Sequence, residues 1–402
     1  MFSDELRFAW DQSLLRGNFS RLLLYCEAYL NDGSPSGFVP SIGDVEYSAS
    51  EGSKGIEIPF VSYPRDLVTI VGRLPEWLPS DSSNVLVPVH PLAGHSDVLE
   101  SPTLRCVPTA SVRTVAVLSP ESDVLGFLKL HFPGKIGRFS RDLYHFKWLA
   151  SLEASAALEQ ASALAGGIYY LPEDYGWFCE PRLGSSTRGW GTLGRTIGAD
   201  LLQQPLIPAF SILAKTSRNP TYPLLTELRD RLDWTMDAAF ENVIGKLIDS
   251  YVLLARDWGL LPECNAQNVL YSIGLNGSTC APVFRDMGDL FKDMVIRRRR
   301  GLSCQFTSYK TIDEDAPDLY ERRSFSYDFK LGCYILAPMI AAIATVWSTN
   351  QNLLICRSAD RFRGKWIDAS SYFRSADTWY SYPDVANVSR SSYVENLEPM
   401  FR

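Results

Sequence analysis

The chain has 402 residues, with 39 lysines and arginines against 46 aspartates and glutamates, which gives a formal net charge of −7 at pH 7. This balance argues against a general binder of nucleic acid or anionic membranes, because phosphate contacts need a basic face. Hydrophobic residues make up 46% of the chain and aromatic residues 12%, which excludes a disordered protein. At about 150 residues per domain, the length predicts two to three structural units.

The eight cysteines are widely scattered and form no C-x-x-C pair. A disulfide framework and a zinc site are therefore not expected, since both need clustered or regularly spaced ligands. The first residues lack the basic start and apolar stretch of a signal peptide, so we expect a cytoplasmic protein. Residues 331–347 are uncharged, but Pro338 interrupts them, and we expect a buried core helix there rather than a membrane span.

Apolar residues at helical spacing predict helices, and short β-rich runs separated by Pro, Gly, Asp and Ser predict strands. The predicted elements are a helix over 5–31, a sheet over 56–132, a helix over 140–165, a β-containing stretch over 168–215, a long amphipathic helical stretch over 224–258 and an apolar helix over 326–350. They predict an α+β fold in three regions. These are 1–105 with a helix and strands, 106–220 with a mainly antiparallel sheet, and 221–402, which is mainly helical and contains a hairpin.

Two further segments leave more than one interpretation open. The Gly-rich stretch 184–195 lacks the order and the lysine of a P-loop, and we expect a flexible hairpin or loop. The arginine run 297–300 fits either a solvated helix end or a contact for an anionic ligand.

Basic and hydroxyl side chains gather around two neighbouring predicted strands. Ser111, Arg113 and Thr114 stand at the head of one apolar strand, Lys129 ends the next strand, and Arg141 follows twelve positions later. Alternation along adjacent antiparallel strands would place Ser111, Arg113 and Lys129 on one face. Fixed cations with hydroxyl donors form a phosphate-binding surface.

A second polar group surrounds a predicted hairpin. Glu263, Gln267 and Asn268 precede its first strand, and Asp286 follows its second strand, so the hairpin would bring them together. Carboxylate and amide oxygens suit Mg²⁺, which itself bridges nucleotide phosphates. The two groups together predict a site for Mg–ATP.

The order of these motifs resembles that of the NRPS-independent siderophore synthetases, the family of the aerobactin synthetases. The matching segments are VPVHP at 87–91, PTASVRT at 108–114, Lys129–Leu130 with Arg141, ECNAQN at 263–268 and Arg285–Asp286, with a further similar segment at 208–213 after Arg195. The resemblance spans about residues 85–290. It implies thumb-, fingers- and palm-like regions, with ATP between the antiparallel sheet and the helical region.

The resemblance implies an AMP-forming ligase that adenylates a carboxylic acid and condenses it with an amine or hydroxyl, in siderophore or related biosynthesis. The implied ATP contacts are Ser111, Arg113, Thr114, Lys129, Arg141, Glu263, Gln267 and Asp286, of which Lys129, Arg141 and Arg113 would be catalytic. The implied Mg²⁺ ligands are Glu263, Asn268 and Asp286, and the implied substrate contact is Asn265. From its place at a strand end, His90 either contacts the substrate or caps a turn, and Arg195 of the Gly-rich stretch is a further candidate for a substrate contact. The implied partners are a small carboxylic acid and an amine, and family members are often homodimers.

The sequence departs from the family pattern at several positions. Asn265 stands where the family has a histidine that helps to bind the carboxylate, and asparagine cannot carry a positive charge, so citrate does not follow as the substrate. Leu92 replaces the tryptophan after His-Pro, the upstream HP-x-H-K motif is absent, and the chain diverges after about residue 300.

Two alternatives therefore remain open. A kinase-like phosphotransferase also holds Mg²⁺ through an asparagine and a later aspartate, although Glu263 replaces its catalytic aspartate. A degenerate member of the family that acts only as a binding partner or scaffold is the other alternative.

Overall fold

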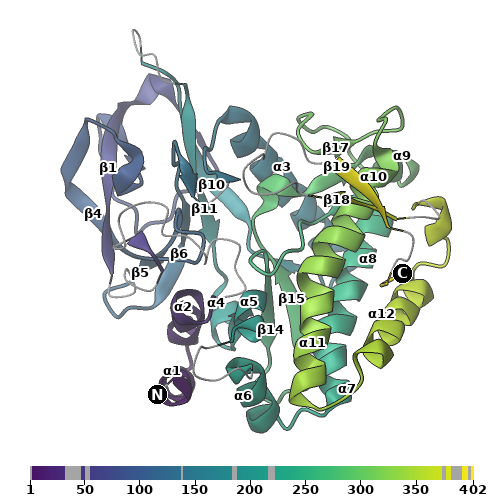
Figure 1. Ribbon diagram of the computed structural model, residues 1–402. Coiled ribbons are helices and arrows are strands. Elements are labelled where there is room, and N and C mark those ends of the chain that lie inside the picture. The colour runs from purple at the N-terminus through teal and green to yellow at the C-terminus, as the bar shows by residue number, and fades with distance from the viewer. Residues whose placement is uncertain are drawn as a thin grey trace. The chain divides into compact units, whose positions relative to one another are not determined.

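The computed structural model describes residues 2–31, 47–49, 55–136, 139–182, 188–215, 222–373, 377–381, 392–396 and 400–402. The chain forms two compact units (Figure 1). Unit 1 comprises Met1–Ala157 and Leu171–Gln204, and unit 2 comprises Leu158–Tyr170 and Pro205–Arg402. The predicted α+β class is confirmed, while positions 184–187 of the Gly-rich stretch lie outside the described residues.

Unit 1 is built on an eight-stranded sheet in which every neighbouring pair of strands is antiparallel. Its strands are β1 (Ile56–Pro64), β2 (Val68–Val71), β3 (Asn84–Pro88), β4 (Val98–Pro108), β5 (Thr114–Leu118), β6 (Val124–Lys129), β10 (Glu173–Cys179) and β11 (Trp190–Thr196). Their order is β2-β10-β11-β6-β5-β4-β1-β3. The sheet takes strands from both of the first two predicted regions, and the predicted boundary at residue 105 falls inside β4.

Helices and short elements complete unit 1. They are α1 (Phe2–Arg16), α2 (Ser20–Tyr29), η3 (Arg65–Leu67), η4 (Pro91–Ala93), α4 (Ala199–Leu202), the first part of α3 (His145–Ala165) and the pair β7 (Lys135–Ile136) and β8 (Phe139–Ser140). Trp148 of α3 packs against Phe178 and Leu193 of the sheet. A Cβ atom at Gly191 would lie 2.6 Å from the Trp148 ring, so this close packing of helix on sheet requires glycine.

Unit 2 contains a four-stranded sheet in the order β12-β14-β15-β9, a three-stranded sheet in the order β13-β16-β17, and the pair β18–β19. Its strands are β9 (Tyr169–Tyr170), β12 (Leu206–Pro208), β13 (Leu260–Leu261), β14 (Val269–Ile273), β15 (Cys280–Phe284), β16 (Phe291–Asp293), β17 (Thr311–Ile312), β18 (Asp377–Ser381) and β19 (Ser392–Asn396). The hairpin predicted from the sequence is the antiparallel pair β14–β15.

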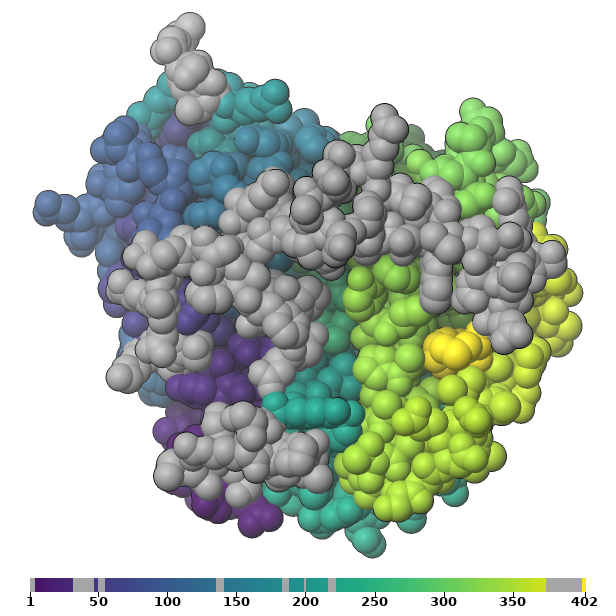
Figure 2. All heavy atoms as spheres, in the orientation of Figure 1, coloured from purple at the N-terminus to yellow at the C-terminus, as the bar shows by residue number. Residues whose placement is uncertain are grey.

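Helices make up most of the remainder of unit 2. They are α5 (Ala209–Leu213), α6 (Pro223–Leu232), α7 (Met236–Ala239), η5 (Phe240–Gly245), α8 (Lys246–Trp258), η6 (Met287–Asp289), α9 (Met294–Arg299), α10 (Leu319–Ser324), η7 (Phe325–Leu336), α11 (Ala337–Val346), α12 (Gln351–Lys365) and η8 (Ala369–Ser371). In the face drawn in Figure 2, the green-to-yellow part of the chain, which includes α11 and α12, forms much of the surface of unit 2.

The apolar segment of the sequence lies in the core of unit 2. Leu319–Val346 is the one helical stretch among the described residues long and apolar enough to cross a membrane, and 56% of its most apolar window is buried inside the protein. Leu331, Ile335 and Met339 are fully buried. The stretch therefore packs as the buried helix that the sequence predicts.

Two predicted helices are broken in the structure. Residues 5–31 form α1 and α2, which are separated at Gly17, and residues 224–258 are divided after α6 at Asp233. Both residues have positive φ, +61° and +49°, and a residue in this conformation ends a helix. The predicted helix over 140–165 also begins later, at His145, because Phe139–Ser140 pair as β8.

Candidate active site

The turn between β4 and β5 carries the first group of predicted phosphate ligands. Val112 has φ +67°, a strained conformation for a β-branched residue. Three local hydrogen bonds hold it: Val112 N–H donates to Thr109 O at 2.9 Å, Thr109 Oγ1 donates to Thr114 O at 2.8 Å, and Thr114 N–H donates to Ser111 Oγ at 3.1 Å. Buried Glu27 of α2 accepts from the Ala110 N–H at 2.9 Å. The turn is therefore held by hydrogen bonds of its own side chains and by one to Glu27 of α2.

The sheet register brings the predicted basic residues into one region of unit 1. Thr114 lies directly opposite Lys129 in the β5–β6 pair, so these two side chains share a face. The Arg113 guanidinium donates to the carbonyl of Arg141 at 2.7 Å. Arg113 and Ser111 precede β5, so strand alternation does not place them as the sequence analysis expected; the turn does.

Lys129 belongs to a buried ion cluster. Lys129 Nζ lies 3.0 Å from Glu173 Oε1, and Arg195 Nη2 lies 2.7 Å from the same oxygen. All three side chains are at most 4% exposed. Glu173 was missed by the sequence analysis. Arg195, predicted as a contact for the acid substrate, shares this carboxylate with the predicted phosphate ligand Lys129.

His90 lies in an apolar environment at the start of η4. Its Nδ1 accepts from the Leu92 N–H at 3.2 Å, and its ring lies edge-on to Phe132 with centroids 5.2 Å apart. Burial lowers the pKa of His90 to about 4, so the ring is neutral at pH 7. Its Nε2 has no hydrogen-bond partner within the described residues, which leaves one polar atom that a substrate could use.

In unit 2, the loop before β14 is organised by Asn265. Its side-chain oxygen accepts from the Gln267 N–H at 2.9 Å and from the Asn268 N–H at 3.0 Å. Asn268 in turn donates through Nδ2 to Glu263 Oε2 at 3.2 Å. Since the Asn265 oxygen holds the loop, its amide NH₂ is the group that this side chain can offer to a substrate.

The hairpin carries Asp286 past the end of this loop. Val269 pairs with Phe284, and the Arg285 N–H donates to the Asn268 carbonyl at 2.9 Å. Asp286 is the next residue after Arg285, so the hairpin brings its backbone close to that of Asn268. Arg285 Nε also donates to Gln267 O at 2.7 Å. Asp286 has φ +67°, a left-handed conformation in which aspartate is several-fold enriched among residues other than glycine.

Glu263 is ion-paired with a residue that the sequence analysis missed. Lys330 Nζ of η7 lies 2.6 Å from Glu263 Oε1. Burial raises the pKa of Glu263, the Lys330 charge opposes this rise, and Asp289 adds to it. The π-helical segment that carries Lys330 is of a type that occurs often at functional sites.

The oxygen donors around the hairpin suit a hard cation that also binds phosphate. Asp286 supplies a carboxylate and Asn268 an amide oxygen, while Glu263 already binds Lys330. Within the described residues, no group of three or more His, Cys, Asp or Glu side chains could hold a metal. Mg²⁺ typically takes only one or two protein carboxylates and fills its shell with phosphate oxygens and water, so the donor set fits this ion.

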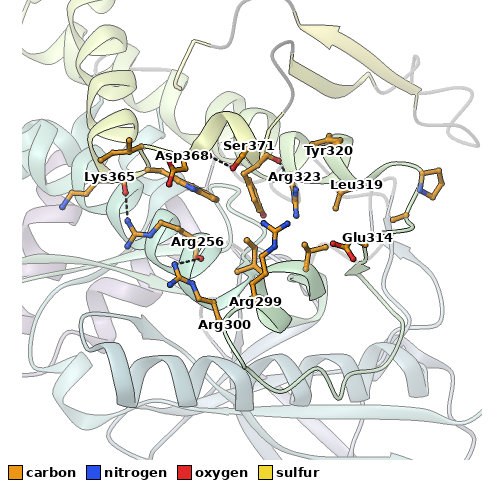
Figure 3. Close-up of a pocket in the computed structure, with 17 residues that line it drawn as sticks. Arg256, Arg299, Arg300, Glu314, Leu319, Tyr320, Arg323, Lys365, Asp368 and Ser371 are labelled. Carbon is orange, nitrogen blue, oxygen red and sulfur yellow. Dashed lines mark hydrogen bonds between the residues drawn. The ribbon is translucent and has the colours of Figure 1, made fainter.

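A cavity of about 820 Å³ in unit 2 includes none of these hairpin residues (Figure 3). Five cationic side chains line it, and four are paired within the protein: Arg256 and Arg300 with Asp257, Arg323 with Asp293, and Lys365 with Asp249. The fifth is Arg299.

The arginine run therefore has mixed roles. Arg297 is buried and donates to Ser303 O and Trp258 O, which neither interpretation of the sequence anticipated. Arg298 pairs with Asp313, and Arg300 with Asp257, so these two are stabilising surface contacts.

The fold is that of the siderophore synthetases, as the motif resemblance predicted. The ATP-bound aerobactin synthetase IucA from a hypervirulent pathotype of Klebsiella pneumoniae is similar with a TM-score of 0.72, over 99% of this chain and 80% of that chain, at 12% identity. The petrobactin biosynthesis protein AsbB from Bacillus anthracis str. Sterne is similar with a TM-score of 0.71, over 94% and 75% of the two chains, at 12% identity.

Aerobactin synthetase IucC from the same Klebsiella pneumoniae pathotype is similar with a TM-score of 0.60, over 83% of this chain and 69% of that chain, at 14% identity. No protein-family model matches the sequence, and no curated protein matches it. The similarity is thus one of three-dimensional structure at low identity.

Proposed function

We propose that this chain is an ATP-dependent, AMP-forming ligase of the NRPS-independent siderophore synthetase type. It adenylates a small carboxylic acid and condenses the acyl-adenylate with an amine or hydroxyl, in the cytoplasm. The observation that carries the proposal is the position of the motif residues on a synthetase fold: Arg113, Lys129 and Arg141 gather in unit 1, and Glu263 to Asp286 gather in unit 2.

The cationic group supports the adenylation step. Attack of the carboxylate on the α-phosphate develops negative charge on that phosphate and on the departing pyrophosphate. Lys129, Arg113 and Arg141, with the Ser111 and Thr114 hydroxyls beside them, would hold these oxygens. The turn, the strand register and the buried carboxylate hold Arg113, Thr114 and Lys129 in place, and fixed donors of this kind stabilise developing charge with little reorganisation.

The hairpin group supports binding of the metal and nucleotide. Asp286 and Asn268 would hold Mg²⁺ through side-chain oxygens, with Glu263 and Gln267 beside them. Magnesium, when bound, neutralises phosphate charge. Burial raises the pKa of Glu263, and the Lys330 ammonium opposes this rise, so Lys330 favours the ionised form of this carboxylate.

The acid substrate would meet neutral hydrogen-bonding groups. His90 offers Nε2, and Asn265 offers its amide NH₂ while its oxygen holds the loop. Two neutral contacts place less positive charge around the acid than a protonated histidine would supply. The proposal therefore favours an acid that carries fewer charges than citrate.

The test is pyrophosphate release from Mg–ATP with a panel of mono-, di- and tricarboxylates and amino acids, each with hydroxylamine as a substitute nucleophile. We expect acid-dependent pyrophosphate and AMP, with the highest rate for a mono- or dicarboxylate. Formation of ADP in place of AMP would overturn the proposal and indicate a phosphotransferase. Failure to bind ATP in calorimetry would favour a non-catalytic binding protein.

A further inference from the structure

Three neighbouring strands of the unit 1 sheet each contribute one charged side chain to a single buried cluster. The strands are β10, β11 and β6, which are adjacent in that order, and the residues are Glu173, Arg195 and Lys129. Glu173 Oε1 accepts from Lys129 Nζ at 3.0 Å, from Arg195 Nη2 at 2.7 Å and from Arg195 Nε at 3.2 Å. One carboxylate oxygen thus joins both cations.

The register of the sheet explains why these residues meet. Glu173 lies directly opposite Arg195, and Arg195 lies opposite Phe127, which is two residues before Lys129 on the same strand. Residues two apart on a strand share a face, so all three charges point to one side of the sheet. The pairing of the three strands therefore sets which face of the sheet carries Glu173, Arg195 and Lys129.

Glu173 is itself held firmly. Its N–H donates to Ser155 Oγ of α3 at 2.9 Å, and a β-bulge at Asp174 separates it from the regular part of β10. Bulges of this kind often redirect a side chain beside a functional site. A Cβ atom at Gly194 would lie 1.9 Å from the Tyr175 ring, so Tyr175 packs over β11 only because that position is glycine.

We propose that Glu173 is a positioning residue that holds Lys129 and Arg195 as one cationic unit for the phosphates of the nucleotide. This inference rests on the proposed function and extends it. Under this inference, Arg195 contacts the phosphates of the nucleotide and not the carboxylic acid substrate. Glu173 acts through the two cations and does not itself touch the substrate.

A double-mutant cycle on Mg–ATP binding tests the inference. The proteins are the full chain and its Lys129→Ala, Glu173→Gln and doubly substituted variants, compared by calorimetry. We expect Glu173→Gln to weaken binding about tenfold, since a charge-assisted contact is lost. The loss in the double variant should be smaller than the product of the two single losses, because Glu173 acts in part through Lys129, and the loss that remains relative to Lys129→Ala is the part that acts through Arg195. Arg195→Met should raise the KM for ATP and leave the KM for the acid unchanged.

Two further variants guard against simple misfolding. Glu173→Asp keeps the charge but shortens the side chain, so it cannot reach both cations and should give an intermediate loss. Asp174→Asn is the matched control, because Asp174 is the next residue, is exposed and accepts hydrogen bonds from the backbone N–H and the hydroxyl of Thr196, away from the cluster. It should bind Mg–ATP as the unchanged protein does.

The outcomes separate this inference from the proposed function. Unchanged binding in Lys129→Ala would overturn the assignment of the nucleotide site itself. Weakened binding in Lys129→Ala with unchanged binding in Glu173→Gln would overturn only the role of Glu173. Losses that multiply in full in the double variant would show that Glu173 does not position Lys129, and would overturn the inference.

Discussion

The two groups of polar residues are fixed in different ways. In unit 1, Lys129 is held by ion pairing: its charge meets a buried carboxylate whose place is set by strand register. In unit 2, Asn268 is held within its own loop, because its backbone N–H and that of Gln267 both donate to the Asn265 side-chain oxygen. The first group depends on charge balance, whereas the second depends on the hydrogen bonds of its loop together with one ion pair, between Glu263 and Lys330. Substitutions should therefore act differently in the two units.

Lys129→Ala should produce the largest effect. It removes a fixed cation at the position proposed for developing phosphate charge, and we expect pyrophosphate release to fall by about 100- to 1,000-fold. Glu173 keeps its pair with Arg195, so the thermal unfolding transition should remain cooperative. Wild-type rates in this variant would contradict the charge-based account of unit 1.

Asp286→Asn should reduce turnover by about 100-fold, since one of the two carboxylates proposed near Mg²⁺ becomes neutral. Part of the loss should be recovered at raised Mg²⁺ concentration, which a titration of rate against metal would show. Asp360→Asn is a matched control, because this carboxylate is 72% exposed on the surface of unit 2. Equal loss in the control would remove the assignment.

Lys330→Met should lower activity by about tenfold near neutral pH and shift its pH profile. Burial raises the pKa of Glu263 and Lys330 opposes that rise, so removing Lys330 raises the pKa further. The ionised carboxylate then persists only at higher pH, and the acid limb of the profile should move to higher pH. An acid limb that stays in place would show that Glu263 does not take part.

Asn265→Ala should lower kcat least of these variants, but it should raise the KM for the acid, because it removes the proposed amide contact, and it should lower stability. It leaves two backbone N–H groups without their acceptor, which should lower the free energy of unfolding by about 1–2 kcal/mol. Asn265→Asp keeps the acceptor and should retain most of the stability. Denaturant unfolding of the three proteins measures this, and an unchanged midpoint in Asn265→Ala would contradict the role of the loop.

Spacing in the sequence predicted the elements and motifs that depend on local pattern. The β14–β15 hairpin formed as expected because its strands are close in the chain and separated by a Gly/Asn turn. Helix breaks at Gly17 and Asp233 were missed, since the apolar spacing continues across both; Gly17 is a residue that often ends a helix, whereas at Asp233 only the backbone conformation marks the break.

Residues whose roles arise from distant pairing could not be found in this way. Glu173 meets Lys129 across 44 positions of sequence, and Lys330 of η7 pairs with Glu263 of the loop before β14, so each charge taken alone looks like an ordinary solvated side chain. The structure supplies the missing information, because only the strand order β10-β11-β6 makes Glu173 a neighbour of two predicted ligands. An acidic residue directly after Leu171-Pro172 was the only local signal.

The path of the chain between the two units limits how such a protein can be divided. Neither unit is a continuous segment: the chain changes unit after Ala157, after Tyr170 and after Gln204. A fragment that ends at Gln204 would contain all of unit 1 together with thirteen residues, Leu158–Tyr170, that belong to the other unit. A single junction in the gene therefore cannot separate the two units, and the exchange of one whole unit between related proteins needs three junctions, after Ala157, Tyr170 and Gln204.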